Sequence, residues 1–330
     1  MEDFENKSGD ESEQKDIEQI TEETNTDKEV FARLNPIGAG FLGLFGGFFL
    51  YQFVGGGLSL LIFGMDLDNA PVNAVRLMTM GGQILFMLLP ALLLSKLVYE
   101  DVGVVIKIKK PDLIALGLFL VGMIILTPLL QSYLAIQNYF IEQWAANYKL
   151  INDIKVFFDS MNALVEKAYS GLLKANNVFE GLLIIIVVAV VPALSEETLF
   201  RGFIQNSFQI KMRPFYAALI TAIFFGLFHF SPYGMLPLIS LGMFFGFAAY
   251  KSDSLIIPMI LHFFNNFVAV IIYFMVGNAD IISTKMETVV ELKDSFILFT
   301  VLLSLFAALI FVINYYYSQN RPRRIYAGMP

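Results

Sequence analysis

The sequence contains no cysteine, only two histidines and a single tryptophan among its 330 residues. The absence of cysteine excludes disulfide scaffolds, thiolate zinc sites, iron–sulfur clusters and cysteine nucleophiles. Charged residues are scarce as well, at 15%, whereas 57% of the residues are hydrophobic, so the chain lies outside the composition of soluble domains. We therefore expect a membrane protein, which buries its apolar surface against lipid and against neighbouring helices.

Several familiar sequence motifs are also missing. The chain has no G-x-S-x-G elbow, no H-E-x-x-H zinc helix, no G-x-G-D pair of membrane aspartyl proteases and no Walker A loop. A G-x-G-x-x-G pattern does occur at Gly38, Gly40 and Gly43, but it opens an apolar run with no strand before it. We interpret these glycines as helix-packing positions rather than a dinucleotide loop. The two halves do not repeat each other, which gives no support to an inverted-repeat transporter.

Eight apolar runs are long enough to cross about 30 Å of hydrocarbon as helices. They lie near residues 37–64, 77–98, 113–134, 178–200, 214–231, 235–250, 254–277 and 294–317. The sequence thus predicts an all-α, polytopic membrane protein of about eight transmembrane helices. An even number of spans places both termini on one side, and the excess of lysine and arginine in the loops on that side predicts that both termini are cytosolic.

The regions outside the spans have distinct compositions. Residues 1–30 carry 12 acidic residues against three lysines and lack periodic apolar residues, so we expect a disordered acidic cytosolic tail over 1–34. The transmembrane domain is predicted at 35–318, followed by a basic C-terminal tail at 319–330. Segment 135–177 is too polar to span the membrane, but its apolar residues recur at helical spacing, which predicts amphipathic helices at the outer interface.

Ionisable side chains inside apolar runs are costly, at roughly 2.5–3.5 kcal/mol each near a helix centre, so their positions are informative. Here they gather in three places, which are the segment 195–201 with Glu196, Glu197 and Arg201, the segment ending in His229, and the segment His262 to Asn266. Both histidines of the chain lie inside predicted spans, where packing alone would favour Leu or Phe. This coincidence indicates a functional site.

Residues four apart share one face of a helix, which suggests how these groups pair. Glu197 and Arg201 can form an ion pair, which leaves the neighbouring Glu196 free for chemistry. His262 and Asn266 can likewise point together as hydrogen-bond donors, as an oxyanion site requires. Phe225, one turn before His229, is expected to pack rather than react.

These residues contain what water-mediated amide hydrolysis needs. A carboxylate can take a proton from water, a histidine can position that water or protonate the leaving amine, and the donors can stabilise a tetrahedral oxyanion.

The order of the three motifs resembles a known family. Glu196-Glu197-x-x-x-Arg201, Phe225-x-x-x-His229 and His262-x-x-x-Asn266 on successive apolar segments look like the CPBP intramembrane protease family. That family includes the type II CAAX prenyl endopeptidases and bacterial bacteriocin-processing or self-immunity proteins. The resemblance covers about residues 178–277, the motif core.

What the resemblance implies is a conical bundle of eight helices with a cavity open to membrane and cytosol. Glu196 would be the general base and His229 its partner in holding the catalytic water, with His262 and Asn266 as oxyanion stabilisers. Glu197 and Arg201 would support them structurally. We expect the lipid bilayer and a membrane-associated, prenylated or peptide-precursor substrate as partners, and no nucleic acid.

Two questions remain open from the sequence: whether the site binds a metal ion, and whether the protein is a protease. Glu196, His229 and His262 are also a common ligand set for catalytic zinc, although Asn266 beside His262 suits an oxyanion site better, so no cofactor is favoured. A non-catalytic immunity or scaffolding protein of the same fold would keep the motifs without proteolysis. A proton-coupled transporter could use the buried Glu and His as a relay.

Overall fold

The computed structural model describes residues 31–64, 70–276 and 291–320, and these residues contain helices and no strand. The acidic tail predicted at 1–34 lies outside the described residues up to residue 30, and the basic tail predicted at 319–330 lies outside them from residue 321. The described residues from Ala32 onward belong to one compact unit. Its all-α architecture confirms the fold class predicted from the sequence.

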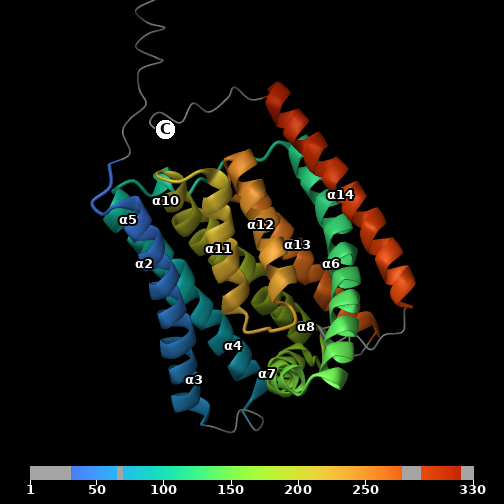
Figure 1. Ribbon diagram of the computed structural model, residues 1–330. Coiled ribbons are helices and arrows are strands. Elements are labelled where there is room, and N and C mark those ends of the chain that lie inside the picture. Colours follow the sequence, from blue (N-terminus) through green and yellow to red (C-terminus); the bar gives the residue numbers. More distant parts are fainter. Residues whose placement is uncertain (1–30, 65–69, 277–290, 321–330) are drawn as a thin grey trace, which may run out of the picture. The chain divides into compact units, whose positions relative to one another are not determined.

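The first three predicted spans and the outer segment form the first half of the helical unit (Figure 1). The first span comprises α2 (Pro36–Phe48), the π-helical turns η1 (Phe49–Gly55) and α3 (Gly56–Phe63). The second comprises α4 (Val72–Gln83), η3 (Ile84–Leu88) and α5 (Leu89–Tyr99), and a short 3₁₀ turn, η4 (Val102–Val104), follows it. Next come α6 (Leu113–Asn147) and α7 (Lys149–Leu173).

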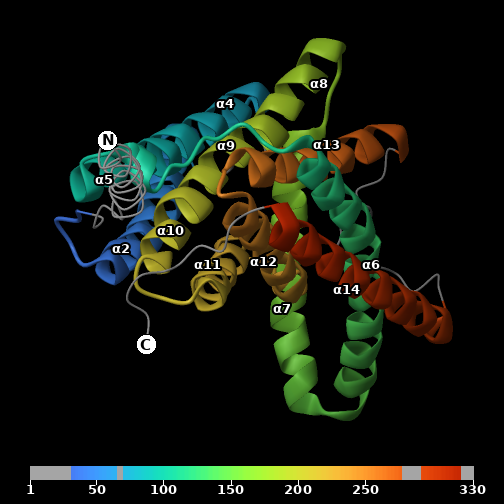
Figure 2. The same cartoon turned by 90° about the horizontal axis from the view of Figure 1, so that it is seen from above.

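The second half contains the three motifs. One long, repeatedly π-helical element comprises α8 (Val178–Ile185), η5 (Ile186–Val190), α9 (Val191–Glu197), η6 (Thr198–Ile204) and α10 (Gln205–Gln209). It is followed by α11 (Pro214–Phe228), α12 (Met235–Ser252), α13 (Ile256–Val276) and α14 (Leu292–Asn320). In both views, α11 and α12 lie between the N-terminal helices and the pair formed by α6 and α14 (Figures 1 and 2).

Seven helices in the described part of the chain are long and apolar enough to cross a membrane. They match seven of the eight predicted spans, and the eighth corresponds to α11, an apolar helix of 15 residues that is shorter than the other seven. The chain is therefore an integral membrane protein.

The largest difference from the sequence-based boundaries is at the third span. Its helix was predicted to end at Leu134, but α6 continues to Asn147, and α7 turns back directly after it. Pro128 lies inside α6 without ending it, although proline removes one helical hydrogen bond. Segment 135–177 is helical throughout most of its length, as the spacing of its apolar residues indicated, but its first part is an extension of the span.

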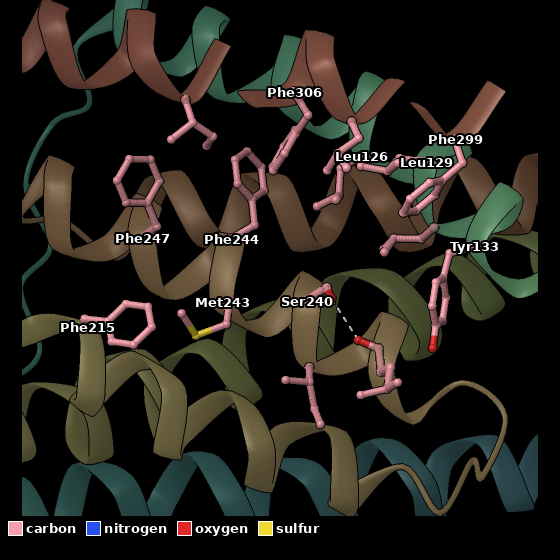
Figure 3. Close-up of a pocket in the computed structure, with 15 residues that line it drawn as sticks. Leu126, Leu129, Tyr133, Phe215, Ser240, Met243, Phe244, Phe247, Phe299 and Phe306 are labelled. Carbon is pink, nitrogen blue, oxygen red and sulfur yellow. Dashed lines mark hydrogen bonds between the residues drawn. The ribbon is translucent and has the colours of Figure 1, made fainter. Parts of the chain in front are cut away.

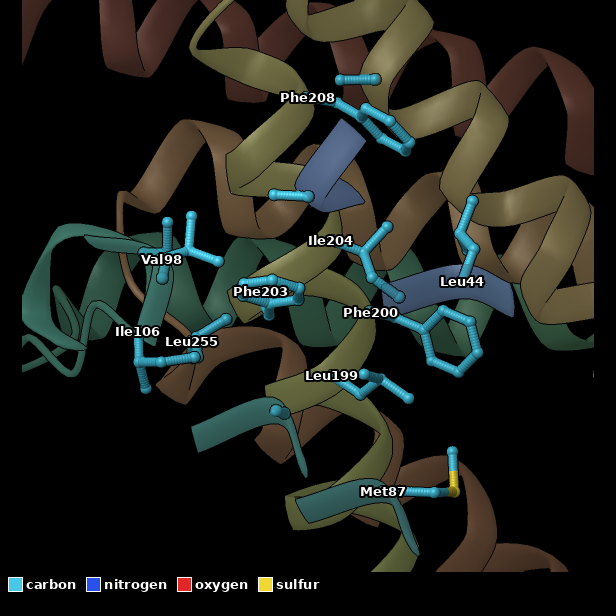
Figure 4. Close-up of a cluster of buried hydrophobic side chains, with 14 of the residues drawn as sticks. Leu44, Met87, Val98, Ile106, Leu199, Phe200, Phe203, Ile204, Phe208 and Leu255 are labelled. Atoms are coloured by element: carbon cyan, nitrogen blue, oxygen red, sulfur yellow. The ribbon is translucent and has the colours of Figure 1, made fainter. Parts of the chain in front are cut away.

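Small residues let the N-terminal helix approach the element that carries the glutamates. A Cβ atom added at Gly40 would lie 2.5 Å from Phe208, one at Gly43 would lie 2.8 Å from Phe203, and one at Gly47 would lie 2.9 Å from Leu199. The three side chains come from η6 and α10 and belong to the main apolar core (Figure 4). Gly40 and Gly43 therefore serve helix packing within the chain, as the sequence predicted. The packing role expected for Gly38 was wrong, because no atom lies within 4 Å of a Cβ atom added there.

Candidate active site

Glu197 and Arg201 form a buried ion pair at the junction of α9 and η6. Arg201 Nη1 donates to Glu197 Oε1 at 2.9 Å, and both side chains are 0% exposed. The guanidinium also donates through Nη2 to the carbonyl oxygen of Gly242 in α12, at 3.1 Å. The pairing expected from the four-residue spacing is thus confirmed. Because a lone buried charge would be very costly, each partner stabilises the other in place.

His262 joins this pair from α13. Its Nδ1 lies 2.8 Å from Glu197 Oε1, and the ring stacks on Phe245 with 5.4 Å between centroids. A carboxylate oxygen only accepts hydrogen bonds, so Nδ1 carries the proton and the neutral ring leaves Nε2 as an acceptor. His262 can therefore donate to an oxyanion from Nε2 only when both ring nitrogens are protonated. No sequence spacing links His262 to Glu197, because the two residues belong to separate helical elements.

Asn266 lies one turn after His262 in α13. Like His262, it contacts the long element that carries the glutamates, but nearer to the start of that element. Its Nδ2 donates to the carbonyl oxygen of Val188 at 2.9 Å, and its Oδ1 accepts from Asn265 at 3.0 Å. Pro192, four residues after Val188, has no N–H to donate to that carbonyl. Asn266 supplies a donor there, and its amide nitrogen has a second N–H for another acceptor.

His229 is placed by the end of α11. The helix ends at Phe228, and His229 follows as its C-cap residue. Its Nδ1 lies 2.7 Å from the carbonyl oxygen of Phe225, so Nδ1 is the protonated nitrogen and Nε2 is the acceptor of the neutral ring. The backbone thereby fixes the tautomer and orientation of a half-buried histidine, an arrangement that suits a group that must accept a proton or hold a water.

Phe225 is the ring around which the second and third motifs meet. Its centroid lies 4.8 Å from the His229 ring and 6.1 Å from the His262 ring. On another side, the guanidinium carbon of Arg201 lies 4.4 Å from the same centroid. Phe225 is buried and packs, as expected. It connects residues of all three motifs through direct contacts with one side chain.

Glu196 differs from its neighbour Glu197. It is half-buried, and its Oε2 is buried without a hydrogen-bond partner among the described residues. Ser195 Oγ, Glu197 Oε2 and Arg201 Nε are likewise buried without such a partner, so the cluster holds several polar atoms that a bound water or substrate can satisfy. The carboxyl group of Glu196 lies near Arg201 and near Tyr51 and Tyr169, two residues outside the three motifs.

Tyr169 brings α7 to the candidate site. Although 37% of the residue is exposed, burial of its hydroxyl, followed by the charge of Glu196, raises the pKa of Tyr169 to about 12. A hydroxyl with this pKa stays protonated at neutral pH and can only donate or accept as a neutral group. The sequence does not show that Tyr169 lies near Glu196. The two residues belong to different helices, and the direction of the turn between those helices cannot be read from the sequence.

The zinc alternative does not fit this arrangement. In residues 31–64, 70–276 and 291–320, no three His, Asp or Glu side chains gather as the ligands of one metal ion would. In particular, Glu196, His229 and His262 do not form such a group, and Glu197 rather than Glu196 contacts His262. Orientation of each histidine through Nδ1 is common to metal ligands and to acid–base residues, so it favours neither.

The described residues form a polytopic, all-helical membrane protein. Three separate helical elements carry the glutamates, the histidines and Asn266, and Glu197, Arg201 and His262 meet in one buried cluster. Residues 178–268 match the family model of the type II CAAX prenyl endopeptidase Rce1-like proteins. The match contains every motif residue from Glu196 to Asn266 and confirms the resemblance to the CPBP intramembrane proteases. No curated protein and no solved structure shows a significant match to the chain.

Proposed function

We propose that the protein is an intramembrane endopeptidase that hydrolyses a peptide bond of a membrane-associated substrate with a water molecule activated by Glu196. The observation that carries this proposal is the contrast within the glutamate pair. Glu197 holds Arg201 and His262 through its Oε1, whereas the buried Oε2 of Glu196, like that of Glu197, has no hydrogen-bond partner among the described residues. One carboxylate is thus structural, and the other is available to a water molecule.

The proposed reaction begins with a water held between Glu196 and Nε2 of His229. Glu196 accepts a proton as the water oxygen attacks the peptide carbonyl carbon, which forms a tetrahedral oxyanion. The second N–H of Asn266 donates to this oxyanion, and His262 lies one turn before Asn266 on the same face of α13. When the carbon–nitrogen bond breaks, the proton held by Glu196 passes to the leaving amine, so a carboxylate, a new acid and a new amine result.

The supporting residues act through these groups. Glu197 fixes the orientation of His262, and the Phe225 carbonyl fixes that of His229. Arg201 neutralises the charge of Glu197, so Glu196 does not lie beside a second unpaired negative charge. We propose a prenylated protein or a peptide precursor as the substrate, on the basis of the family whose model matches residues 178–268.

The experiment that tests this function compares the termini of peptides in membranes that contain the wild-type chain or Glu196→Gln at equal protein levels. Fragments that appear only with wild type would support proteolysis and identify the substrate. We expect the variant to lose about 10²- to 10⁴-fold in the rate of a confirmed cleavage. Glu100→Gln is the matched control, because Glu100 pairs with Arg33 at the exposed surface.

Two outcomes would contradict the proposal. Unchanged cleavage of a confirmed substrate by Glu196→Gln would show that Glu196 is not the base. Identical peptide termini from wild type and variant in the native host would favour a non-catalytic immunity or scaffolding protein of the same fold.

A further inference from the structure

An apolar groove lies on the opposite side of α12 from the candidate active site. It has a volume of about 610 Å³, and its walls are α12 and the start of α11 on one side and α6 with α14 on the other. Figure 3 shows Phe244 and Phe247 of α12 facing Leu126 of α6 and Phe306 of α14 across it. α14 packs chiefly on α6 and contacts α12 where the rings of Phe244 and Phe306 lie 5.5 Å apart, so the groove is the space beside this contact.

The groove wall offers hydrocarbon contacts and few polar groups. Phenylalanine, leucine and isoleucine form most of the lining. The hydroxyl of Ser240, which lies in the middle of the wall, donates to the carbonyl oxygen of Leu236 at 2.9 Å in its own helix. A ligand in the body of the groove must therefore be apolar, because a polar one would lose hydrogen bonds to water without replacement.

Positive charge is found at one end of the groove. The amino group of Lys251 lies 5.7 Å from the ring centroid of Phe247, which lines the groove. Arg213 is exposed and comes two residues before Phe215, which lines the same end. The nearby carboxylate of Asp253 is already neutralised by Lys107 at 3.0 Å and by Lys109. Lys251 and Arg213 thus place two cationic side chains at this end of the groove.

The length of the groove corresponds to one leaflet of a bilayer. Its lining on α12 extends from Leu236 to Phe247, which is about 16 Å at roughly 1.5 Å per helical residue. The hydrocarbon core of a bilayer is about 30 Å thick, so each leaflet contributes about half of that. An acyl chain that starts beside Phe247 would end near Leu236.

We propose that this groove binds one anionic phospholipid, with an acyl chain along α12 and the phosphate at Lys251 and Arg213. The occupant is amphipathic because the site is amphipathic, with hydrocarbon along the wall and positive charge at one mouth. The other face of α12 contacts the candidate active site, where the Gly242 carbonyl accepts from Arg201 and Phe245 stacks on His262. The lipid would thus lie one helix away from the catalytic groups. Its binding does not depend on the proposed proteolysis.

Photolabelling tests the proposal with the full-length chain in nanodiscs of phosphatidylcholine that contain a small fraction of phosphatidylglycerol with a diazirine on its acyl chain. We expect labelled peptides to concentrate on the groove-facing residues of α12 and α6. Met243→Trp and, as a smaller change, Ser240→Leu fill the groove and should each lower this labelling severalfold. Leu93→Trp, at an exposed apolar position of α5, is the matched control and should leave it unchanged.

The charge at the mouth is tested by competition between unlabelled lipids. Phosphatidylglycerol should displace the probe better than phosphatidylcholine, and Lys251→Gln or Arg213→Gln should each reduce that preference by about fivefold. Lys96→Gln, near the end of α5, is the control for a basic residue remote from the groove.

Three results would overturn the proposal. Equal labelling of α5 and α12 would mean that the probe reports only lipid surrounding the protein. Equal displacement by the two lipids would show that the groove does not prefer an anionic headgroup. Displacement by a farnesylated peptide but not by phosphatidylglycerol would assign the groove to a lipidated peptide instead.

Discussion

The Nδ1 atom of His262 lies 2.8 Å from Oε1 of Glu197, the same carboxylate oxygen that Arg201 contacts at 2.9 Å. One oxygen thus connects α13 to the long element that carries the glutamate pair. The two adjacent glutamates therefore have different roles. Glu197 holds other side chains in place, and Glu196 does not.

Glu197→Gln should destabilise the protein by about 3–5 kcal/mol, because it leaves the guanidinium of Arg201 buried without a counter-charge. Thermal unfolding in detergent, followed by the loss of monodisperse protein, measures the effect. The control is Glu100→Gln, which removes an exposed ion pair with Arg33 and should cost about 1 kcal/mol or less. Equal stability of the two variants would contradict the structural role of Glu197.

Asn266→Ala should lower kcat by about 10²- to 10³-fold on a confirmed substrate, as loss of an oxyanion donor does in other hydrolases. The neighbouring Asn265→Ala removes only the donor to Asn266 Oδ1 and should have a smaller effect. Steady-state kinetics with both variants provide the comparison. An effect confined to KM would place Asn266 in substrate binding rather than in the transition state.

Gly43→Ala should destabilise the packing of α2 on η6 by about 1–3 kcal/mol, because the new Cβ atom would lie 2.8 Å from the Phe203 ring. Gly46→Ala on the same helix is the control, since no atom lies within 4 Å of a Cβ atom added there. The difference in unfolding temperature between the two variants measures the cost. If they unfold together, the close approach of α2 is not required for stability.

Tyr233→Phe should loosen α7 from the loop that follows His229. The Tyr233 hydroxyl donates to Asp159 Oδ1 at 2.8 Å, and both burial and this carboxylate raise the pKa of Tyr233, so the hydroxyl remains a donor throughout the neutral range. Loss of a hydrogen bond to a charged group costs about 1.5–3 kcal/mol. Hydrogen exchange over α7 should accelerate correspondingly.

The control for this change is Tyr216→Phe, at an exposed tyrosine near the start of α11. If exchange over α7 were the same in both variants, the Tyr233–Asp159 contact would not hold the helix. If exchange accelerated while cleavage of a confirmed substrate stayed at the wild-type rate, α7 would be anchored by Tyr233 without assisting the reaction.

The sequence by itself determined the class of fold and the positions of the spans. Hydrophobic length is a local property, and an apolar helix must satisfy its own backbone in lipid, so the predicted runs agree with the helices observed. The end of the third span was wrong by 13 residues because the polar residues after Leu134 remain helical beyond the apolar run. Local composition cannot distinguish an extended helix from a new one.

Within the site, the sequence also determined the contact between Glu197 and Arg201, because a separation of four residues fixes the geometry on one helix. Only the tertiary structure decided that His262 contacts Glu197, that Asn266 contacts the carbonyl of Val188, and that Tyr169 lies near Glu196. These residues come from different helices, and the rotation and depth of one helix against another are set by side-chain packing along their whole length. Periodicity indicates which face of a helix is buried, but the partner of each buried group depends on how all the helices fit together.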